Sequence, residues 1–146
     1  DPGDQYEGHP LPSVECILVA GSPHALATAE GIISQLQLQA FVELSVHDPS
    51  DPTPESEAAL FGGSRVYYLS DFSTKKQALL MGLGFGWMPE YLVREELADG
   101  RLSELNYEGG SRYSFIPTLV HPVHRPLGRA GTRFLTLSTG GIEEVL

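Results

Sequence analysis

The sequence predicts an α/β fold, with a mostly parallel sheet covered on both faces by helices. The main observation is the segment 65–105, where short apolar runs typical of strands alternate with helical patterns. A second observation is size: 146 residues, 41% of them hydrophobic, are enough for one compact domain or a domain of two lobes with a real core. No run of about 18 apolar residues occurs, so no membrane-spanning helix is expected.

The N-terminal third predicts a strand, a helix and a second strand after an extended lead-in, 1–12. Residues 13–20, SVECILVA, are typical of a strand, which the following Gly-Ser-Pro would end. Within 27–38, apolar side chains recur at helical spacing, so we expect one buried helical face made of Ala29, Ile32, Ile33 and Leu36. Residues 40–46 alternate between apolar and polar and predict a half-buried strand.

Residues 47–54, HDPSDPTP, contain three prolines and predict a loop. Its carboxylates do not follow the ligand order of a calcium-binding loop, and the central glycine is missing, so an acidic loop is the preferred interpretation. One or two helical turns are expected over 55–61, ended by a pair of glycines.

The segment 65–69 predicts a strand that runs into a turn, 70–71. We expect a helix to start at Ser73 or Thr74, because Thr74 and Gln77 have the spacing of a capping box. The later elements are expected in the order strand 85–88, a helix from Pro89 to Gly100, strand 102–105, loop 106–112, a strand over 113–123 broken at Pro117, and helix 125–137.

The turn from Ser70 to Thr74 is the best place in the sequence for a bound ligand. In parallel α/β sheets, ligands lie at the carboxyl ends of strands and near helix N-termini. Hydroxyl groups followed by free helix N–H groups would suit a carboxylate or another anion. Alternatively, Ser70, Ser73 and Thr74 only cap the helix, and the residues by themselves leave both interpretations open.

Other constellations point to no chemistry, so no cofactor and no enzymatic activity are expected. The GLGFG segment, 82–86, follows a helix and precedes a strand, which is the reverse of a dinucleotide-binding fingerprint. His121 and His124 could bind a metal, but no third ligand lies near them in the sequence. Cys16 is expected in the core, and Trp87 in the core or in the wall of a cleft.

The net charge is −10 and is unevenly distributed. Residues 1–64 hold ten acidic side chains and no Lys or Arg, whereas 109–146 hold four Arg and two acidic residues. An acidic chain repels nucleic acid, so this chain is not expected to bind DNA or RNA by itself. The basic stretch either balances the acidic N-terminal half, which we favour, or offers a site for an anion or an acidic partner.

The order of these elements resembles the effector-binding domain of LysR-type transcriptional regulators. The similarity rests on 65–105, with its strand, polar turn, GLGFG and MP, and the closing LADGRL. The N-terminal VECILVAGSPHALA resembles the hinge strand of the family, followed by its SPxHPLA-type sequence, with Ala25 in place of the usual proline. The returning strand from Pro117 and the final helix agree more weakly. The chain starts at Asp1 without methionine and is expected to be a piece of a longer protein.

The resemblance implies a type II periplasmic-binding-protein-like fold, with two lobes joined by two hinge strands and the N-terminal part of the first lobe absent. Residues 23–119 would be the second lobe, and 1–22 with 120–146 would be the hinge strands and the C-terminal part of the first lobe. A small effector, expected to be anionic, would bind between the lobes. The residues that the resemblance implies for this site are Ser70, Ser73 and Thr74, with Gly21, Ser22, Phe72 and Thr118 as weaker candidates.

The same resemblance implies a cytoplasmic homodimer or homotetramer that is not bound to a membrane. It would reach operator DNA only through a helix-turn-helix domain that this chain lacks. The alternative is a solute-binding protein of a transport system, which shares the fold.

Overall fold

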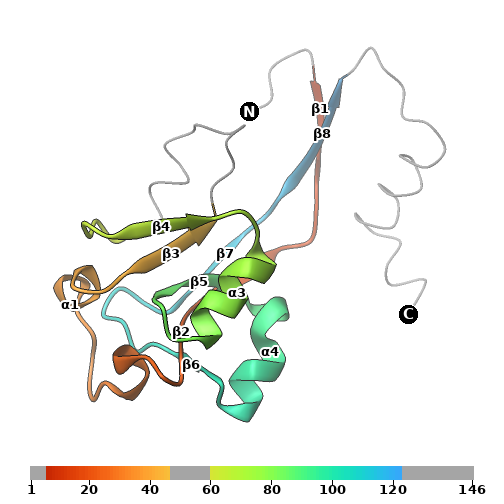
Figure 1. Cartoon of the computed structure of the whole chain (residues 1–146). Coiled ribbons are helices and arrows are strands. Elements are labelled where there is room, and N and C mark those ends of the chain that lie inside the picture. The colour runs from red at the N-terminus through yellow and green to blue at the C-terminus, as the bar shows by residue number, and fades with distance from the viewer. Residues whose placement is uncertain (1–5, 47–59, 123–146) are drawn as a thin grey trace. The chain divides into compact units, whose positions relative to one another are not determined.

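The computed structural model describes residues 6–46 and 60–122 (Figure 1). The chain divides into two compact units: Glu15–Tyr113, and Asp1–Val14 together with Ser114–Leu146. Within the second, the strands β1 (Tyr6–Pro10) and β8 (Thr118–Pro122) form an antiparallel pair. The unit Glu15–Tyr113 contains η1, a 3₁₀ helix (Ala25–Thr28), α1 (Gln35–Gln39), β3 (Glu43–Val46), β4 (Val66–Leu69), α3 (Phe72–Leu80), β5 (Phe85–Pro89), α4 (Glu90–Asp99) and β6 (Leu102–Glu104). It also contains most of β2 (Val14–Gly21) and the first half of β7 (Arg112–Phe115).

The sheet is mixed, which corrects the prediction of a mostly parallel one. Its strands have the order β4-β3-β5-β2-β6, and β7 also pairs with β2. β3 is parallel to β4 and β5, but β2 is antiparallel to β5 and β6. The local sequence could not reveal this, because a buried strand has the same apolar composition whichever way its neighbours run.

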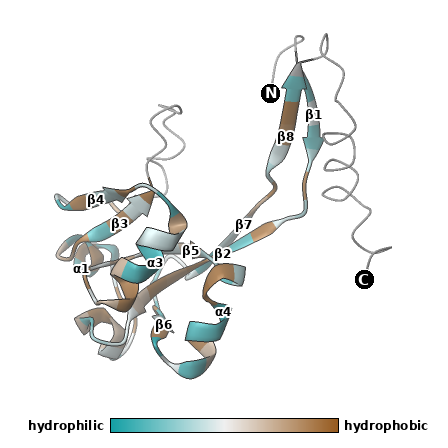
Figure 2. Ribbon diagram, turned by 45° about the vertical axis from the view of Figure 1, so that its right-hand side comes forward, coloured by the Kyte–Doolittle hydropathy of each residue, from teal (hydrophilic) through white to brown (hydrophobic). Residues whose placement is uncertain are grey.

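Both faces of the sheet are covered, as predicted, and the alternation of β2 explains how. Ile17 and Val19 lie in a core cluster with Leu79 of α3 and Val93 of α4. The intervening residues, Leu18 and Ala20, lie in a second cluster with residues of η1 and α1 and with the aromatic residues Phe61 and Phe85. Figure 2 shows α3 and α4 carrying both hydrophobic and hydrophilic residues, as expected of helices that cover a sheet.

The helix predicted over 27–38 is wrong. Gly31 adopts a φ of +76°, and the backbone of Ile33 bonds to the loop after β6, its N–H donating to the Asn106 carbonyl at 2.7 Å. A new helix, α1, starts only after Ser34, which caps it in a capping box with Gln37. Three of the four residues of the predicted apolar face are therefore exposed: Ala29, Ile32 to 69% and Leu36 to 77%. The helical spacing was present, but a left-handed glycine and a strong N-cap interrupted it.

Helix α3 starts at Phe72, one or two residues earlier than the predicted Ser73 or Thr74, and the expected capping box is wrong. Asp71 is the N-cap, and its carboxylate accepts the N–H of Thr74 at 2.7 Å. The helix ends as predicted at Gly82, which has a φ of +77°. There the N–H groups of Gly82 and Leu83 donate to the carbonyls of Leu79 and Ala78, which is a Schellman motif.

Several predictions at the ends of the chain have different outcomes. The break at Pro117 is confirmed, because β7 ends at Phe115 and β8 begins at Thr118. The lead-in 1–12 contains the strand β1, whose partner lies more than 100 residues away in the sequence. The predicted acidic loop, most of the helical turns expected before Gly62, and the final helix 125–137 lie outside the described residues.

Candidate functional site

The turn from Ser70 to Thr74 connects the end of β4 to the start of α3. β3, β4 and β5 run in the same direction, so their carboxyl ends share one edge of the sheet. The N-terminus of α3 therefore lies at this edge, as predicted. Ser70, Phe72, Ser73 and Thr74 lie within one short segment, interrupted only by Asp71, and all four are exposed to a ligand at the surface.

Asp71 occupies the donors of this turn. Besides the N–H of Thr74, the hydroxyls of Thr74 and Ser70 and the N–H of Ser73 donate to its carboxylate. These hydrogen bonds hold the pKa of Asp71 below its ordinary value, the bond from the Thr74 N–H contributing most. The interpretation that Ser70, Ser73 and Thr74 cap the helix is therefore wrong, because the cap is Asp71. An anion would have to compete with this carboxylate for the same N–H groups.

A buried lysine lies one residue after the turn. Lys75 is 4% exposed, and its Nζ donates to the carbonyl oxygen of Trp87 in β5. The same Nζ is 5.9 Å from the centre of the Phe72 ring, which is 41% exposed. Burial lowers the pKa of Lys75 to about 8, while Glu43 and Cys16 act in the opposite direction. Gly86 makes room for this side chain, because a Cβ there would be 3.1 Å from Cε of Lys75.

Further titratable groups lie near this lysine. Glu43 is 3% exposed and accepts the N–H of Phe61 at 2.9 Å. Burial raises its pKa, against the opposing effects of that hydrogen bond and of Lys75. Cys16 is buried, as predicted, and its thiol is hydrogen-bonded to the hydroxyl of Tyr113. Burial, followed by this bond, raises the pKa of Tyr113.

Trp87 completes this end of the sheet. Its ring meets that of Tyr113 edge-on, with 4.7 Å between centroids, and stacks on Phe61 at 5.9 Å. It is half-buried, which fits the predicted place in the core or in a wall. The sequence could have revealed Lys75, because it precedes the core residues Ala78 and Leu79 by three and four positions and so lies on the buried face of the helix. No comparable signal in the sequence pointed to Glu43 or Tyr113.

The structure does not bring Gly21 and Ser22 to this turn. A Cβ at Gly21 would be 2.0 Å from the carbonyl oxygen of Leu79, so Gly21 packs against the C-terminal end of α3, whereas the turn is at its N-terminal end. The N–H of Ser22 donates to the carbonyl of Arg101 at 2.9 Å. Thr118 belongs to the other unit, in β8, where it pairs with Pro10.

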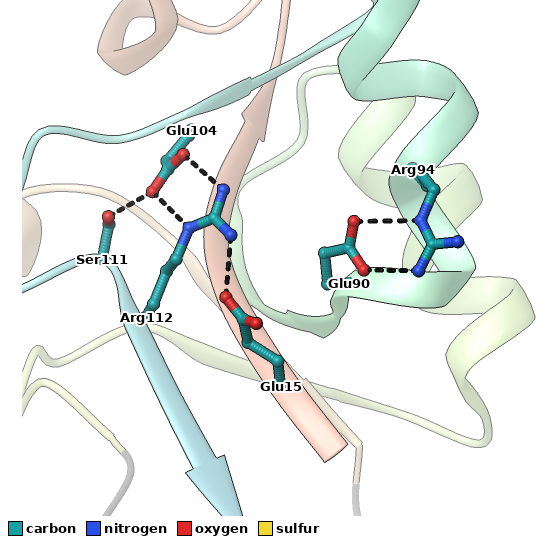
Figure 3. Close-up of polar contacts among 6 residues, drawn as sticks. All are labelled: Glu15, Glu90, Arg94, Glu104, Ser111 and Arg112. Atoms are coloured by element: carbon teal, nitrogen blue, oxygen red, sulfur yellow. Dashed lines mark hydrogen bonds and ion pairs between the residues drawn. The ribbon is translucent and has the colours of Figure 1, made fainter. Parts of the chain in front are cut away.

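Arg112 joins three strands of the sheet near their ends (Figure 3). Its guanidinium contacts both carboxylate oxygens of Glu104 in β6 at 3.1 Å and the carboxylate of Glu15 in β2 at 2.7 Å. Ser111 also donates to Glu104. Arg112 therefore pairs with one acidic residue of the N-terminal half, Glu15, and with one outside it, Glu104. The other three arginines of that stretch lie outside the described residues.

In the part of the chain that the structure describes, no helix has the length and hydrophobicity needed to cross a membrane.

Comparisons with known proteins agree with one another. A family model described as the LysR substrate binding domain matches residues 2–140. The HTH-type transcriptional activator AllS of Klebsiella pneumoniae is 28% identical over 94 residues, which are 64% of this chain and 35% of that protein. The chain thus spans about a third of the length of this curated relative.

Two solved structures share the fold. One is the full-length LTTR LysG from Corynebacterium glutamicum with bound effector Arg, with a TM-score of 0.66 and 17% identity over 99% of this chain and 48% of LysG. The other is the C-terminal domains of a LysR family protein from Agrobacterium tumefaciens, with a TM-score of 0.65 and 22% identity over 100% of this chain and 70% of that one.

Proposed function

Because this chain belongs to the LysR substrate-binding domain family, we propose that it is the regulatory part of a longer transcription regulator and that it binds a small-molecule effector. The family match over residues 2–140 carries this proposal. The name of the curated relative, an HTH-type transcriptional activator, supports it. Contact with operator DNA would come from a helix-turn-helix segment outside this chain, in a cytoplasmic homodimer or homotetramer.

For the effector site, we propose the turn formed by Ser70, Phe72, Ser73 and Thr74. Three observations support it: the turn lies at the carboxyl edge of parallel strands, it is exposed, and the ring of Phe72 offers an apolar surface beside it. The predicted lobes, 23–119 and 1–22 with 120–146, stay a proposal.

The charge of the effector is a separate part of the proposal. The sequence suggested an anion, which would use the N–H groups at the start of α3. Since the Asp71 carboxylate already accepts from these groups, the turn supports an effector that presents a donor, such as an ammonium or hydroxyl group. An anionic group on the same effector would need contacts elsewhere in the site.

The test is a panel of anionic, zwitterionic and cationic metabolites, screened by thermal shift on the full-length protein and followed by calorimetry. For a compound that binds, we expect Ser70→Ala and Asp71→Asn to weaken affinity. Ser22→Ala is the matched control, because it removes the same hydroxyl group at the other end of α3. Unchanged affinity in Ser70→Ala together with a loss in Ser22→Ala would move the site to the opposite edge of the sheet.

Regulation requires more than binding. An effector shifts a conformational equilibrium only if it binds one of the two states more tightly. We therefore expect the compound to change the affinity or spacing of the full-length protein on its promoter in a gel-shift or footprinting assay. A compound that binds without changing either would count against a regulatory role. The alternative of a transport solute-binding protein is not favoured by the relatives and neighbours described above, which are named as regulators or as LysR family proteins.

A further inference from the structure

A cluster of two imidazoles and a carboxylate lies on the pair formed by β1 and β8. Glu7 and His9 are on β1, two residues apart, so their side chains are on the same face. Glu7 pairs directly with His121 of β8. The three side chains therefore share one face of a two-stranded ribbon, within a single unit of the chain.

The ligand atoms of these residues converge. Nε2 of His9 and Nε2 of His121 are 3.0 Å apart, and the Glu7 carboxylate oxygens are 3.6 Å from the first and 3.7 Å from the second. All three ligand atoms lie within 4.8 Å of one another. Around a tetrahedral zinc ion with bonds of about 2.0–2.2 Å, neighbouring ligand atoms are separated by roughly 3.3–3.5 Å. The observed separations fall on both sides of this value, so a small adjustment of side-chain rotamers would allow one ion to contact all three.

The chemistry of the three groups fits the same ion. Neutral imidazole and carboxylate are ordinary zinc ligands, and two histidines with one carboxylate leave a fourth position for water or another ligand. The site is also accessible, because the side chain of Glu7 is 58% exposed and those of the two histidines are partly exposed. In the absence of an ion, close contact between two Nε2 atoms requires one ring to donate and the other to accept.

We propose that Glu7, His9 and His121 bind a divalent transition metal ion of the zinc class, which links β1 to β8. The sequence pointed to His121 and His124 as a possible ligand pair but offered no third ligand. The pairing of β1 with β8 supplies two ligands in addition to His121, namely Glu7 and His9, from the opposite end of the chain. His124 lies outside the described residues and has no part in the proposal. The site does not depend on the proposed effector or on DNA binding.

The test is zinc binding by the 146-residue chain, measured by competition with a chromogenic chelator. We expect one zinc ion per chain and an affinity at least about tenfold lower in each of His9→Gln, His121→Gln and Glu7→Gln. Glu30→Gln is the matched control, because it removes one exposed carboxylate elsewhere and is expected to bind zinc like the wild type. Cobalt gives a second readout, since a four-coordinate cobalt site has much stronger visible absorption than hydrated cobalt.

The proposal is overturned if the wild-type chain does not compete with the chelator, or if all three variants retain its affinity. If circular dichroism shows that a variant is unfolded, the proposal is tested on the wild-type protein instead. There, zinc is expected to shift the NMR ring resonances of His9 and His121 and to leave that of buried His24 unchanged. Unchanged resonances of His9 and His121 at saturating zinc would refute the site.

Discussion

Replacing Lys75 by methionine tests whether a charged amine is buried beside the candidate site. The pKa of Lys75 is lowered from 10.5 to about 8, chiefly by burial. A shift of one pKa unit is worth 1.36 kcal/mol, so burying Lys75 as the ammonium costs about 3 kcal/mol more than burying it as the neutral amine. Below about pH 8 the amine is protonated in both the folded and the unfolded state, so this cost is fully present.

As the pH rises from about 8 to about 10.5, the folded protein loses this proton while the unfolded chain keeps it. The unfolded state then binds more protons, so the free energy of unfolding increases with pH over this window. Between pH 7 and pH 9 we expect the wild type to gain roughly 1 kcal/mol of stability relative to Lys75→Met, which cannot titrate. Urea unfolding of both proteins at pH 7, 8 and 9 measures the difference.

The comparison with the variant matters because other buried groups oppose this trend. Burial raises the pKa of Cys16 and of Tyr113, so both favour the folded state less as the pH rises past their unfolded values. These contributions are common to the two proteins and largely cancel. Lys75→Leu is a second control, because leucine packs differently from methionine but also cannot titrate. The free energy of unfolding of Lys75→Leu is therefore expected to change with pH in the same way as that of Lys75→Met. A stability difference that does not change between pH 7 and pH 9 would refute the buried ammonium.

Two further predictions concern packing. Leu79→Ala removes a fully buried side chain and is expected to lower the free energy of unfolding by about 2–5 kcal/mol. Leu36→Ala, at a position that is 77% exposed, is expected to change it by less than about 0.5 kcal/mol. Equal losses of stability in the two variants would contradict the interruption of the predicted helix over 27–38. Gly21→Ala places a Cβ 2.0 Å from the Leu79 carbonyl oxygen and is expected to cost about 1–3 kcal/mol in urea unfolding, with Ser22→Ala as a neighbouring control. A Gly21→Ala protein as stable as the wild type would show that α3 does not pack against β2 at this point.

The segment 65–105 was predicted nearly completely, because its signals are local. A strand ends where a polar turn begins, a helix ends where a left-handed glycine permits a Schellman motif, and Gly100 ends the next helix with a φ of +84°. The match of residues 2–140 to the LysR substrate-binding family confirms the resemblance that this segment suggested. The turn at Ser70 could be located for the same reason, since it follows directly from the strand-to-helix order.

Errors arose where two signals compete or where the partner is distant. Residues 27–38 have helical spacing, but the N–H of Ile33 bonds to Asn106, far along the chain, and Ser34 begins another helix. Thr74 and Gln77 have the spacing of a capping box, yet the preceding Asp71 is the stronger acceptor at that helix end.

The sequence by itself determined which residues could form strands, turns and helix ends, and to which family the chain belongs, because these depend on backbone preferences and on the order of neighbours. Only the tertiary structure decided the direction of β2 within the sheet, the placement of Glu43 near Lys75, and the meeting of Glu7 and His9 with His121. Each of these depends on the pairing of strands, or the packing of a helix on a strand, between residues far apart in the sequence. Such pairing lowers the free energy only once the intervening chain has folded, so no local pattern records it.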